Sequence, residues 1–170
     1  MSPHFSPAKI ATFSDVAREV ARMPTVTREG RRLHYETEGE GHPVAFVSDA
    51  GYGAWQWAWQ HGSVAGPRTA LVWDLPGTGR SDAPSGGVDV DTLAADFEAV
   101  LGDAGVRQTH VVGAGLGGMV ALRYAREYNR ARTLALFDTA ATGTAVDESA
   151  LRDLHPLDHD GDACRESLSG

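Results

Sequence analysis

The sequence predicts an α/β fold in which a mostly parallel sheet carries helices on both faces. Strand-like and helix-like segments alternate along residues 43–137. The later strands, such as residues 69–73 and 133–137, are apolar throughout instead of alternating with polar residues. Such strands are typical of a parallel sheet that is covered on both sides. A glycine-rich turn also leads directly from a strand into a helix at residues 113–118, as expected where the two elements are closely packed.

The first elements form a hairpin and a buried strand. Residues 25–28 and 32–37 flank Glu29-Gly30, a turn signal between two strand-like segments. Residues 43–47 predict a short buried strand, and the glycine-rich loop Asp49-Ala-Gly-Tyr-Gly53 follows it. Three tryptophans come next, at positions 55, 57 and 59. They either line a substrate pocket or pack the first helix against the sheet, and the sequence leaves both interpretations open.

The later elements continue the alternation. Residues 69–73 predict a buried strand that ends at Asp74-Leu-Pro-Gly-Thr-Gly-Arg-Ser-Asp82. Residues 91–101 have apolar side chains at 93, 94, 97, 100 and 101, which is the spacing of one helical face, and Gly105 closes that helix. A strand at 110–112, a sharp turn at 113–118, a helix at 119–127 and a strand at 133–137 complete the series.

The two ends differ from the middle of the chain. We expect residues 1–22 to be an extension, or a mis-assigned start if translation begins at Met23 instead of Met1. Residues 23–143 form the predicted domain. Residues 144–170 are an acidic tail with seven acids and two arginines, which we interpret as the start of a lid or linker.

Composition excludes several classes of function. The net charge of −8 argues against a general nucleic-acid binder, because phosphate binding needs a basic surface. The mean hydropathy of −0.27 and the lack of a run of about 18 apolar residues argue against a membrane protein. The single cysteine, Cys164, rules out an internal disulfide framework and favours a cytoplasmic location. Asp158-His-Asp-Gly-Asp162 has a misplaced glycine for a calcium loop, so we expect no metal site.

Four blocks of sequence resemble the α/β-hydrolase fold family over about residues 25–142. They are the hairpin with the strand at 43–47 and its glycine-rich loop, the segment Trp73-Asp-Leu-Pro-Gly-Thr-Gly-Arg-Ser-Asp-Ala-Pro84, the helix at 91–101, and residues 110–122 with the strand ending in Phe137-Asp-Thr139. The resemblance implies hydrolysis of a small ester, lactone, epoxide or similar molecule without a cofactor. It also implies that the sequence stops before the last strands of the fold.

The sequence departs from the family at the nucleophile. The family places a serine at the centre of Gly-x-Ser-x-Gly, a sharp turn called the nucleophile elbow. Here that frame is Gly113-Ala-Gly-Leu-Gly117, so Gly115 stands at the nucleophile position. A glycine has no side chain that could attack a substrate.

The oxyanion region also departs from the family. The family commonly has His-Gly after the strand at 43–47, whereas this chain has Ser48-Asp49. A carboxylate at Asp49 would repel a developing oxyanion if it faced the site. The backbone N–H groups of Ala50 and Leu116 could still line a concavity that favours anions at the start of the helix. The residues expected around the oxyanion site and its pocket are Asp49, Ala50, Gly51, Leu116 and Trp55.

The other catalytic groups of the family are missing or doubtful. Asp138 stands where some members place the acid, although an ordinary loop aspartate is the favoured interpretation. No histidine occupies the family's position, and His155 and His159 are interpreted as part of a solvated tail. We therefore expect no serine-hydrolase activity from this chain, as a truncated product or a pseudo-enzyme. A mechanism without a serine and a role in ligand binding remain open, so the sequence does not decide whether the chain is an enzyme.

A rival interpretation uses the same glycines. Gly113-x-Gly115-x-x-Gly118 follows a strand and precedes a helix, and Asp138 lies twenty residues further on, as in a flavin or NAD site. Such a motif should open the first βαβ unit, yet at least two strand units precede it here. A parallel sheet that stops early would also leave an unpaired edge, so we expect association of this chain with itself.

Overall fold

The computed structural model describes residues 24–140, and it confirms the predicted α/β architecture. The elements in chain order are β1 (Thr25–Arg28), β2 (Arg31–Glu38), β3 (Pro43–Val47), the 3-10 helix η1 (Ala54–Trp57), α2 (Ala58–Val64), β4 (Thr69–Trp73), α3 (Val90–Asp103), β5 (Thr109–Ala114), α4 (Leu116–Glu127) and β6 (Ala131–Phe137). The predicted extension at 1–22, the acidic tail at 144–170, and His155, His159 and Cys164 lie outside the described residues.

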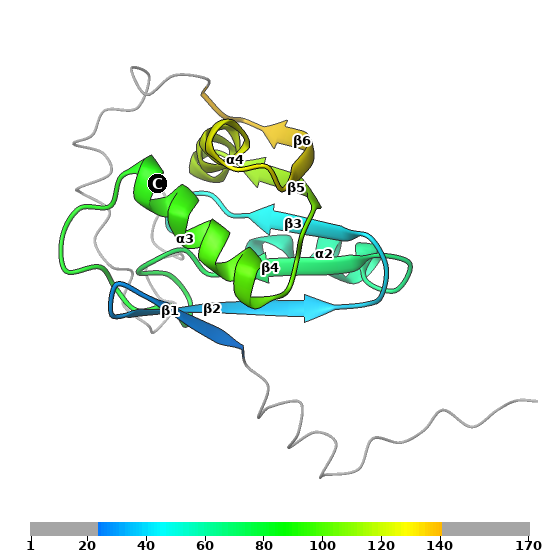
Figure 1. The fold of residues 1–170 in the computed structure, drawn as a ribbon, viewed down its shortest axis with the longest axis horizontal. Helices are drawn as coiled ribbons and strands as arrows, with labels where there is room; N and C mark the ends of the chain where they lie inside the picture. The colour runs from blue at the N-terminus through cyan, green and yellow to red at the C-terminus, as the bar shows by residue number, and fades with distance from the viewer. Residues whose placement is uncertain (1–23, 141–170) are drawn as a thin grey trace, which may run out of the picture.

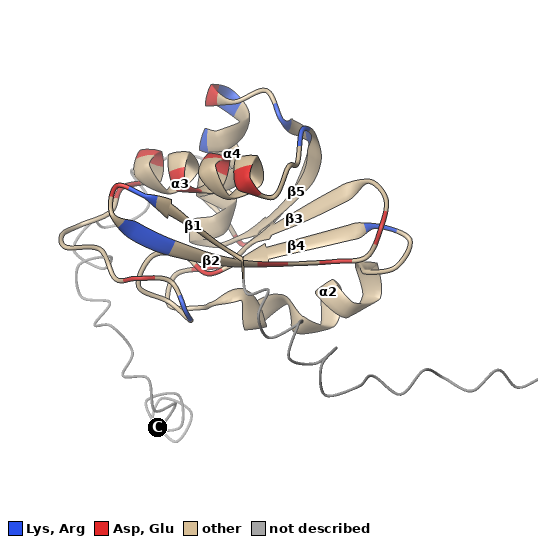
Figure 2. Cartoon of the chain, turned by 60° about the horizontal axis from the view of Figure 1, so that its bottom comes forward, with Lys and Arg blue, Asp and Glu red and all other residues tan. Residues whose placement is uncertain are grey.

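The six strands form one sheet in the order β1-β2-β4-β3-β5-β6. The pairs β3–β4, β3–β5 and β5–β6 are parallel, whereas β2 pairs antiparallel with β1 and β4. Helices α3 and α4 lie on one face of the sheet, and α2 lies on the other (Figures 1 and 2). The carboxyl ends of β3 and β5 therefore lie side by side, which brings the loop after β3 to the start of α4.

Alternating side chains of the central strands fill two separate cores. In β4, Leu71 and Trp73 face α3 and α4, whereas Ala70 and Val72 face η1 and α2. Trp73 stacks on Phe97 of α3 with ring centroids 5.7 Å apart. Both faces of β4 are thus buried, which explains why the sequence of this strand is apolar throughout.

The largest difference from prediction lies between β5 and α4. The sequence predicted a turn over 113–118, but β5 extends to Ala114 and α4 begins at Leu116. The turn is a single residue, Gly115. Glycine is a poor helix former, so the local sequence gives no sign that Gly117 and Gly118 belong to a helix. Tertiary packing overrides that preference, because the first turn of α4 lies directly against the end of β3.

No helix in residues 24–140 is long and apolar enough to cross a membrane.

Candidate functional site

The turn at Gly115 has the backbone conformation of a strained elbow. Its φ of 50° and ψ of −118° lie in a region that residues with a side chain rarely adopt. The end of β6 holds this turn in place. The Gly115 amide donates to the carbonyl oxygen of Phe137 at 3.0 Å, and the Thr139 hydroxyl donates to the carbonyl oxygen of Gly115 at 2.7 Å. The elbow is therefore built, although its central residue has no side chain.

The neighbouring glycines are required by packing. A Cβ added to Gly113 would come within 2.5 Å of the carbonyl oxygen of Gly117, and one on Gly117 would overlap the carbonyl oxygen of Val47. A Cβ on Gly118 would meet the side chain of Thr139 at 2.5 Å. Close packing thus gives the glycine spacing a structural reason. The flavin or NAD site inferred from the same spacing stays a prediction, and the absorbance spectrum of the purified protein would test it.

The loop after β3 forms the opposite side of the site. The Asp49 amide donates to Gln56 Oε1 at 2.8 Å, which ties the start of the loop to η1. Asp74, at the end of β4, is buried and accepts hydrogen bonds from the amides of Ala54 at 2.6 Å and Arg80 at 3.0 Å. One carboxylate therefore joins the loop after β3 to the loop after β4. These bonds hold the loop whose first residue, Asp49, lies against Gly115.

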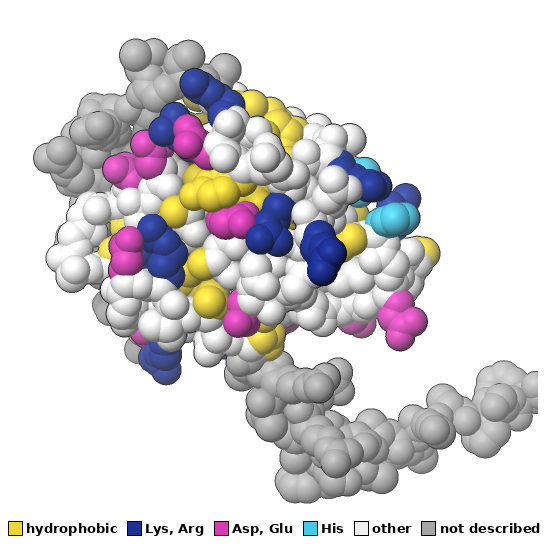
Figure 3. Space-filling view, in the orientation of Figure 1, with side chains coloured by type: hydrophobic (Ala, Val, Ile, Leu, Met, Phe, Trp, Pro, Cys, Tyr) yellow, Lys and Arg dark blue, Asp and Glu magenta, His cyan; other side chains and the backbone are white. Residues whose placement is uncertain are grey.

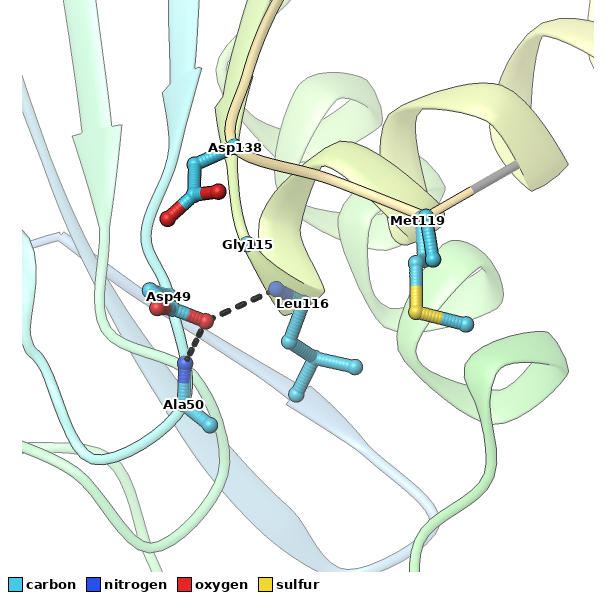
Figure 4. Close-up of a pocket in the computed structure, with 7 residues that line it drawn as sticks. Asp49, Ala50, Gly115, Leu116, Met119 and Asp138 are labelled. Carbon is cyan, nitrogen blue, oxygen red and sulfur yellow. Dashed lines mark hydrogen bonds between the residues drawn. The ribbon is translucent and has the colours of Figure 1, made fainter. Parts of the chain in front are cut away.

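The side chain of Asp49 faces the elbow. Its Oδ1 atom accepts hydrogen bonds from the amides of Ala50 at 2.7 Å and Leu116 at 2.8 Å (Figure 4). Two backbone donors that converge on one oxygen have the arrangement of an oxyanion hole. Here the oxygen belongs to the protein itself. Any external oxyanion would have to displace a charge-assisted pair of hydrogen bonds to reach these donors.

Asp49 also occupies the space that a side chain at position 115 would need. A Cβ built on Gly115 would overlap the Oδ1, Cγ and Oδ2 atoms of Asp49. The two positions thus exclude each other's side chains. Where the family has a small residue at the loop and a serine at the elbow, this chain has a carboxylate at the loop and a glycine at the elbow.

A cavity of about 260 Å³ lies in front of the elbow. Its lining consists of Asp49, Ala50, Gly115, Leu116, Met119, Asp138 and Ala140. The structure thus brings together Asp49, Ala50 and Leu116 from the predicted set. Gly51 and Trp55 do not line this cavity. The volume is slightly below the usual range for sites of drug-sized ligands, so it suits a smaller molecule.

Asp138 lies on the rim of this cavity, next to Gly115 (Figure 4). It has a positive φ of 46° and is exposed. Sequence reasoning did not identify Met119 and Ala140 as lining residues. Met119 lies one helical turn after Gly115, and that spacing was the signal that could have identified it.

The tryptophans that the sequence singled out have different roles. Trp57 is buried and packs on Phe46, with ring centroids 5.3 Å apart. Trp59 is 87% exposed. Trp55 lines a second cavity of about 270 Å³ together with Glu36, Ala54, Ala58, His61 and Arg80. Trp57 thus packs against the sheet, as one interpretation predicted. Trp55 lines a cavity, and its role in a substrate pocket stays a prediction.

Glu36 in the second cavity belongs to a small charged cluster. It pairs with Arg80 and lies 3.3 Å from Nε2 of the buried His34. Burial pushes the pKa of Glu36 up, but the hydrogen bonds with Arg80 and His34 outweigh it and lower the pKa below its ordinary value. The two charges of this cavity therefore neutralise each other.

Known proteins resemble this chain in sequence and in structure. Residues 68–157 match the family model described as alpha/beta hydrolase fold. The soluble epoxide hydrolase of Corynebacterium sp. strain C12 is 32% identical over 96 residues, which cover 56% of this chain and 34% of that protein. The cis-3-alkyl-4-alkyloxetan-2-one decarboxylase of Shewanella oneidensis is 30% identical over 152 residues, covering 85% of this chain and 45% of that protein.

A solved structure described as Est816, an N-acyl homoserine lactone degrading enzyme, matches with a TM-score of 0.69 and 26% identity. The match covers 76% of this chain and 52% of the solved chain. This chain therefore spans about half of the matched structure, and less than half of the two curated relatives above.

Proposed function

Because the chain belongs to the α/β-hydrolase fold family, we propose that its elbow cavity takes a small oxygen-containing molecule without serine-type hydrolysis. The relatives named above act on an epoxide, an oxetan-2-one or a lactone, all of which contain a small oxygen ring. A cavity of about 260 Å³ with apolar side chains from Leu116 and Met119 suits the same class of ligand.

One observation carries the proposal. The Asp49 carboxylate accepts the hydrogen bonds of both backbone donors, and Gly115 offers no nucleophile beside them. Removing one oxyanion donor from a serine enzyme lowers kcat by about a hundredfold to a thousandfold. A site whose two donors are already occupied and whose serine is absent should hydrolyse esters no faster than background.

An esterase assay on three proteins tests this proposal. We expect background hydrolysis of para-nitrophenyl acetate by the wild type and by Gly115→Ser, in which the new side chain competes with Asp49 for space. The double variant Asp49→Gly, Gly115→Ser frees the two backbone donors and supplies a hydroxyl. It is the control that shows whether the Asp49 carboxylate is what keeps a serine at position 115 from acting. Wild-type turnover far above background would overturn the proposal.

Ligand binding without catalysis is the second candidate function, and the retained cavity favours it. Trp57 is buried in the second core beside the loop after β3, so we expect its fluorescence to change when a ligand shifts that loop. A screen of small lactones and epoxides by tryptophan fluorescence would detect saturable binding. Saturation without consumption of the ligand would identify a binding role, whereas turnover without a covalent ester would point to catalysis by another route.

A further inference from the structure

The carboxylate of Asp49 is placed where the fold normally presents its nucleophile. A Cβ at Gly115 would overlap all three atoms of that carboxylate group, so Asp49 reaches the elbow position from the loop after β3. We propose that Asp49 is itself the nucleophile of this site, and that Oδ2 attacks a carbon atom of a strained cyclic ether. This inference rests on the proposed absence of serine chemistry and names the group that acts in its place.

The two oxygens of Asp49 have different surroundings. Oδ1 accepts both backbone hydrogen bonds, from Ala50 and Leu116. Oδ2 accepts no hydrogen bond from residues 24–140, and Asp49 lines the cavity. The donors thus hold the group in one orientation, and the second oxygen remains available to a ligand. Holding a reacting group in the right orientation is one of the ways in which a protein lowers the barrier of a displacement reaction.

An ester formed at this position keeps every existing hydrogen bond. When Oδ2 attacks the ring carbon, the new C–O bond forms as the ring C–O bond breaks. The ring oxygen takes a proton from a water molecule, and that water leaves as hydroxide in the solvent. Oδ1 then becomes the carbonyl oxygen of the ester and stays between the amides of Ala50 and Leu116. Covalent chemistry at a carboxylate is an established form of nucleophilic catalysis.

Asp138, the other carboxylate at the cavity, is less suited to this role. It lies on the exposed rim, and none of the hydrogen bonds within residues 24–140 holds its carboxylate. The described lining of the cavity includes no histidine that could activate water. An ester at Asp49 should therefore accumulate long enough to be detected by mass.

The test is covalent labelling of the full chain with propylene oxide at neutral pH. We expect one added epoxide per chain by intact mass, located at Asp49 by peptide mapping. Because the amides orient this group, labelling should be at least about tenfold faster at Asp49 than at the exposed Asp91. The Asp49→Asn variant keeps an oxygen that accepts both hydrogen bonds, so it should stay folded and lose the label. Asp91→Asn, on α3, should label at Asp49 as the wild type does.

Equal labelling of Asp49 and Asp91 would overturn the proposal. An unlabelled Asp49 beside labelled surface carboxylates would also overturn it when the wild type forms no diol. Conversion of the epoxide to a diol by the wild type but not by Asp49→Asn would support it, because the ester would then form and be hydrolysed. The esterase assay stays independent of this result. Ester hydrolysis by the wild type would refute the proposal that the site lacks serine-type activity. The labelling experiment would still decide whether Asp49 acts as a nucleophile.

Discussion

At the residue scale, positions 49 and 115 form a coupled pair. The Asp49 carboxylate fits between the loop and α4 only because Gly115 has no Cβ. Gly115 in turn adopts its φ of 50° without the strain that a side chain would add. Each residue leaves room for the other. A substitution at one position should therefore change how much a substitution at the other lowers the free energy of unfolding.

Gly115→Ser should destabilise the wild type by roughly 2–5 kcal/mol, from backbone strain and from overlap with Asp49. In an Asp49→Gly background only the backbone strain remains, so the cost of the same change should fall by at least about 1 kcal/mol. Urea unfolding of the two single variants and the double variant measures this coupling. Gly86→Ser is the control, because a Cβ there meets open space. Additive effects at positions 49 and 115 would show that the two side chains do not compete.

At the element scale, α3 is attached to the molecule by two aspartates. Asp89 caps its N-terminus and accepts a hydrogen bond from the Thr92 amide at 2.7 Å. Asp96 lies in the middle of the helix, where its fully buried side chain contacts Arg28 at 2.8 Å and Arg31 at 3.2 Å. Since these arginines flank the turn between β1 and β2, Asp96 joins the hairpin to α3. Asp89 therefore fixes where α3 begins, and Asp96 fixes the contact of α3 with the β1–β2 hairpin.

The cap should make part of the stability depend on pH. The hydrogen bond from Thr92 lowers the pKa of Asp89, so the contribution is present at neutral pH and is lost as the pH falls below about 4. Asp89→Ala should cost about 1 kcal/mol at neutral pH. Asp89→Asn keeps a hydrogen-bond acceptor but has no charge. The difference in the free energy of unfolding between this variant and the wild type should therefore become smaller as the pH falls. Urea unfolding at several pH values measures this difference. A difference that grows as the pH falls would contradict the role of Asp89 as a charged helix cap.

Loss of the buried ion pairs should be far more costly than loss of an exposed one. Asp96→Ala leaves two arginines without their buried partner, and we expect a loss of about 3–5 kcal/mol. Asp91→Ala on the same helix removes an exposed pair with Arg123 and should cost less than about 1 kcal/mol. Thermal and urea unfolding compare the two variants. Equal costs would mean that Asp96 does not anchor the hairpin.

At the scale of the whole molecule, β6 is the exposed end of the sheet. It pairs with β5 on one side, and its other edge has no partner strand within residues 24–140. Phe137 and Leu136 of this strand are 55% and 37% exposed. On the face that Figure 3 shows, acidic and basic side chains are interspersed, and hydrophobic side chains lie both near its centre and at the β6 end. An apolar strand with an open edge favours pairing with another chain.

We propose that two copies of this chain associate through β6. Light scattering during size-exclusion chromatography should give a mass that rises with concentration for the wild type. Leu136→Lys places a charge on the edge and should shift the protein towards the monomer. Trp59→Lys, at a more exposed site on α2, should leave the association unchanged. A wild type that stays monomeric at every concentration would refute the proposal.

Much of the fold follows from local patterns. The hairpin, the strands Pro43–Val47 and Thr69–Trp73, and α3 are visible in the sequence because periodicity and turn residues act over a few neighbours. The start of α4 was misplaced because its glycines are unfavourable locally and required only by contact with β3. Likewise, nothing in the sequence separates Trp55 from Trp57, since the sheet alone decides which of them is buried.

The sequence by itself determined the α/β architecture, the elbow frame and the absence of a serine at position 115. Only the tertiary structure decided where the Asp49 carboxylate lies. Asp49 and Leu116 are 67 positions apart, and they meet because β3 and β5 are adjacent parallel strands whose carboxyl ends share one edge. A local pattern specifies which groups are present, whereas strand pairing specifies which of them touch. The sequence therefore shows that a glycine stands at position 115, and the fold shows that the Asp49 carboxylate lies against it.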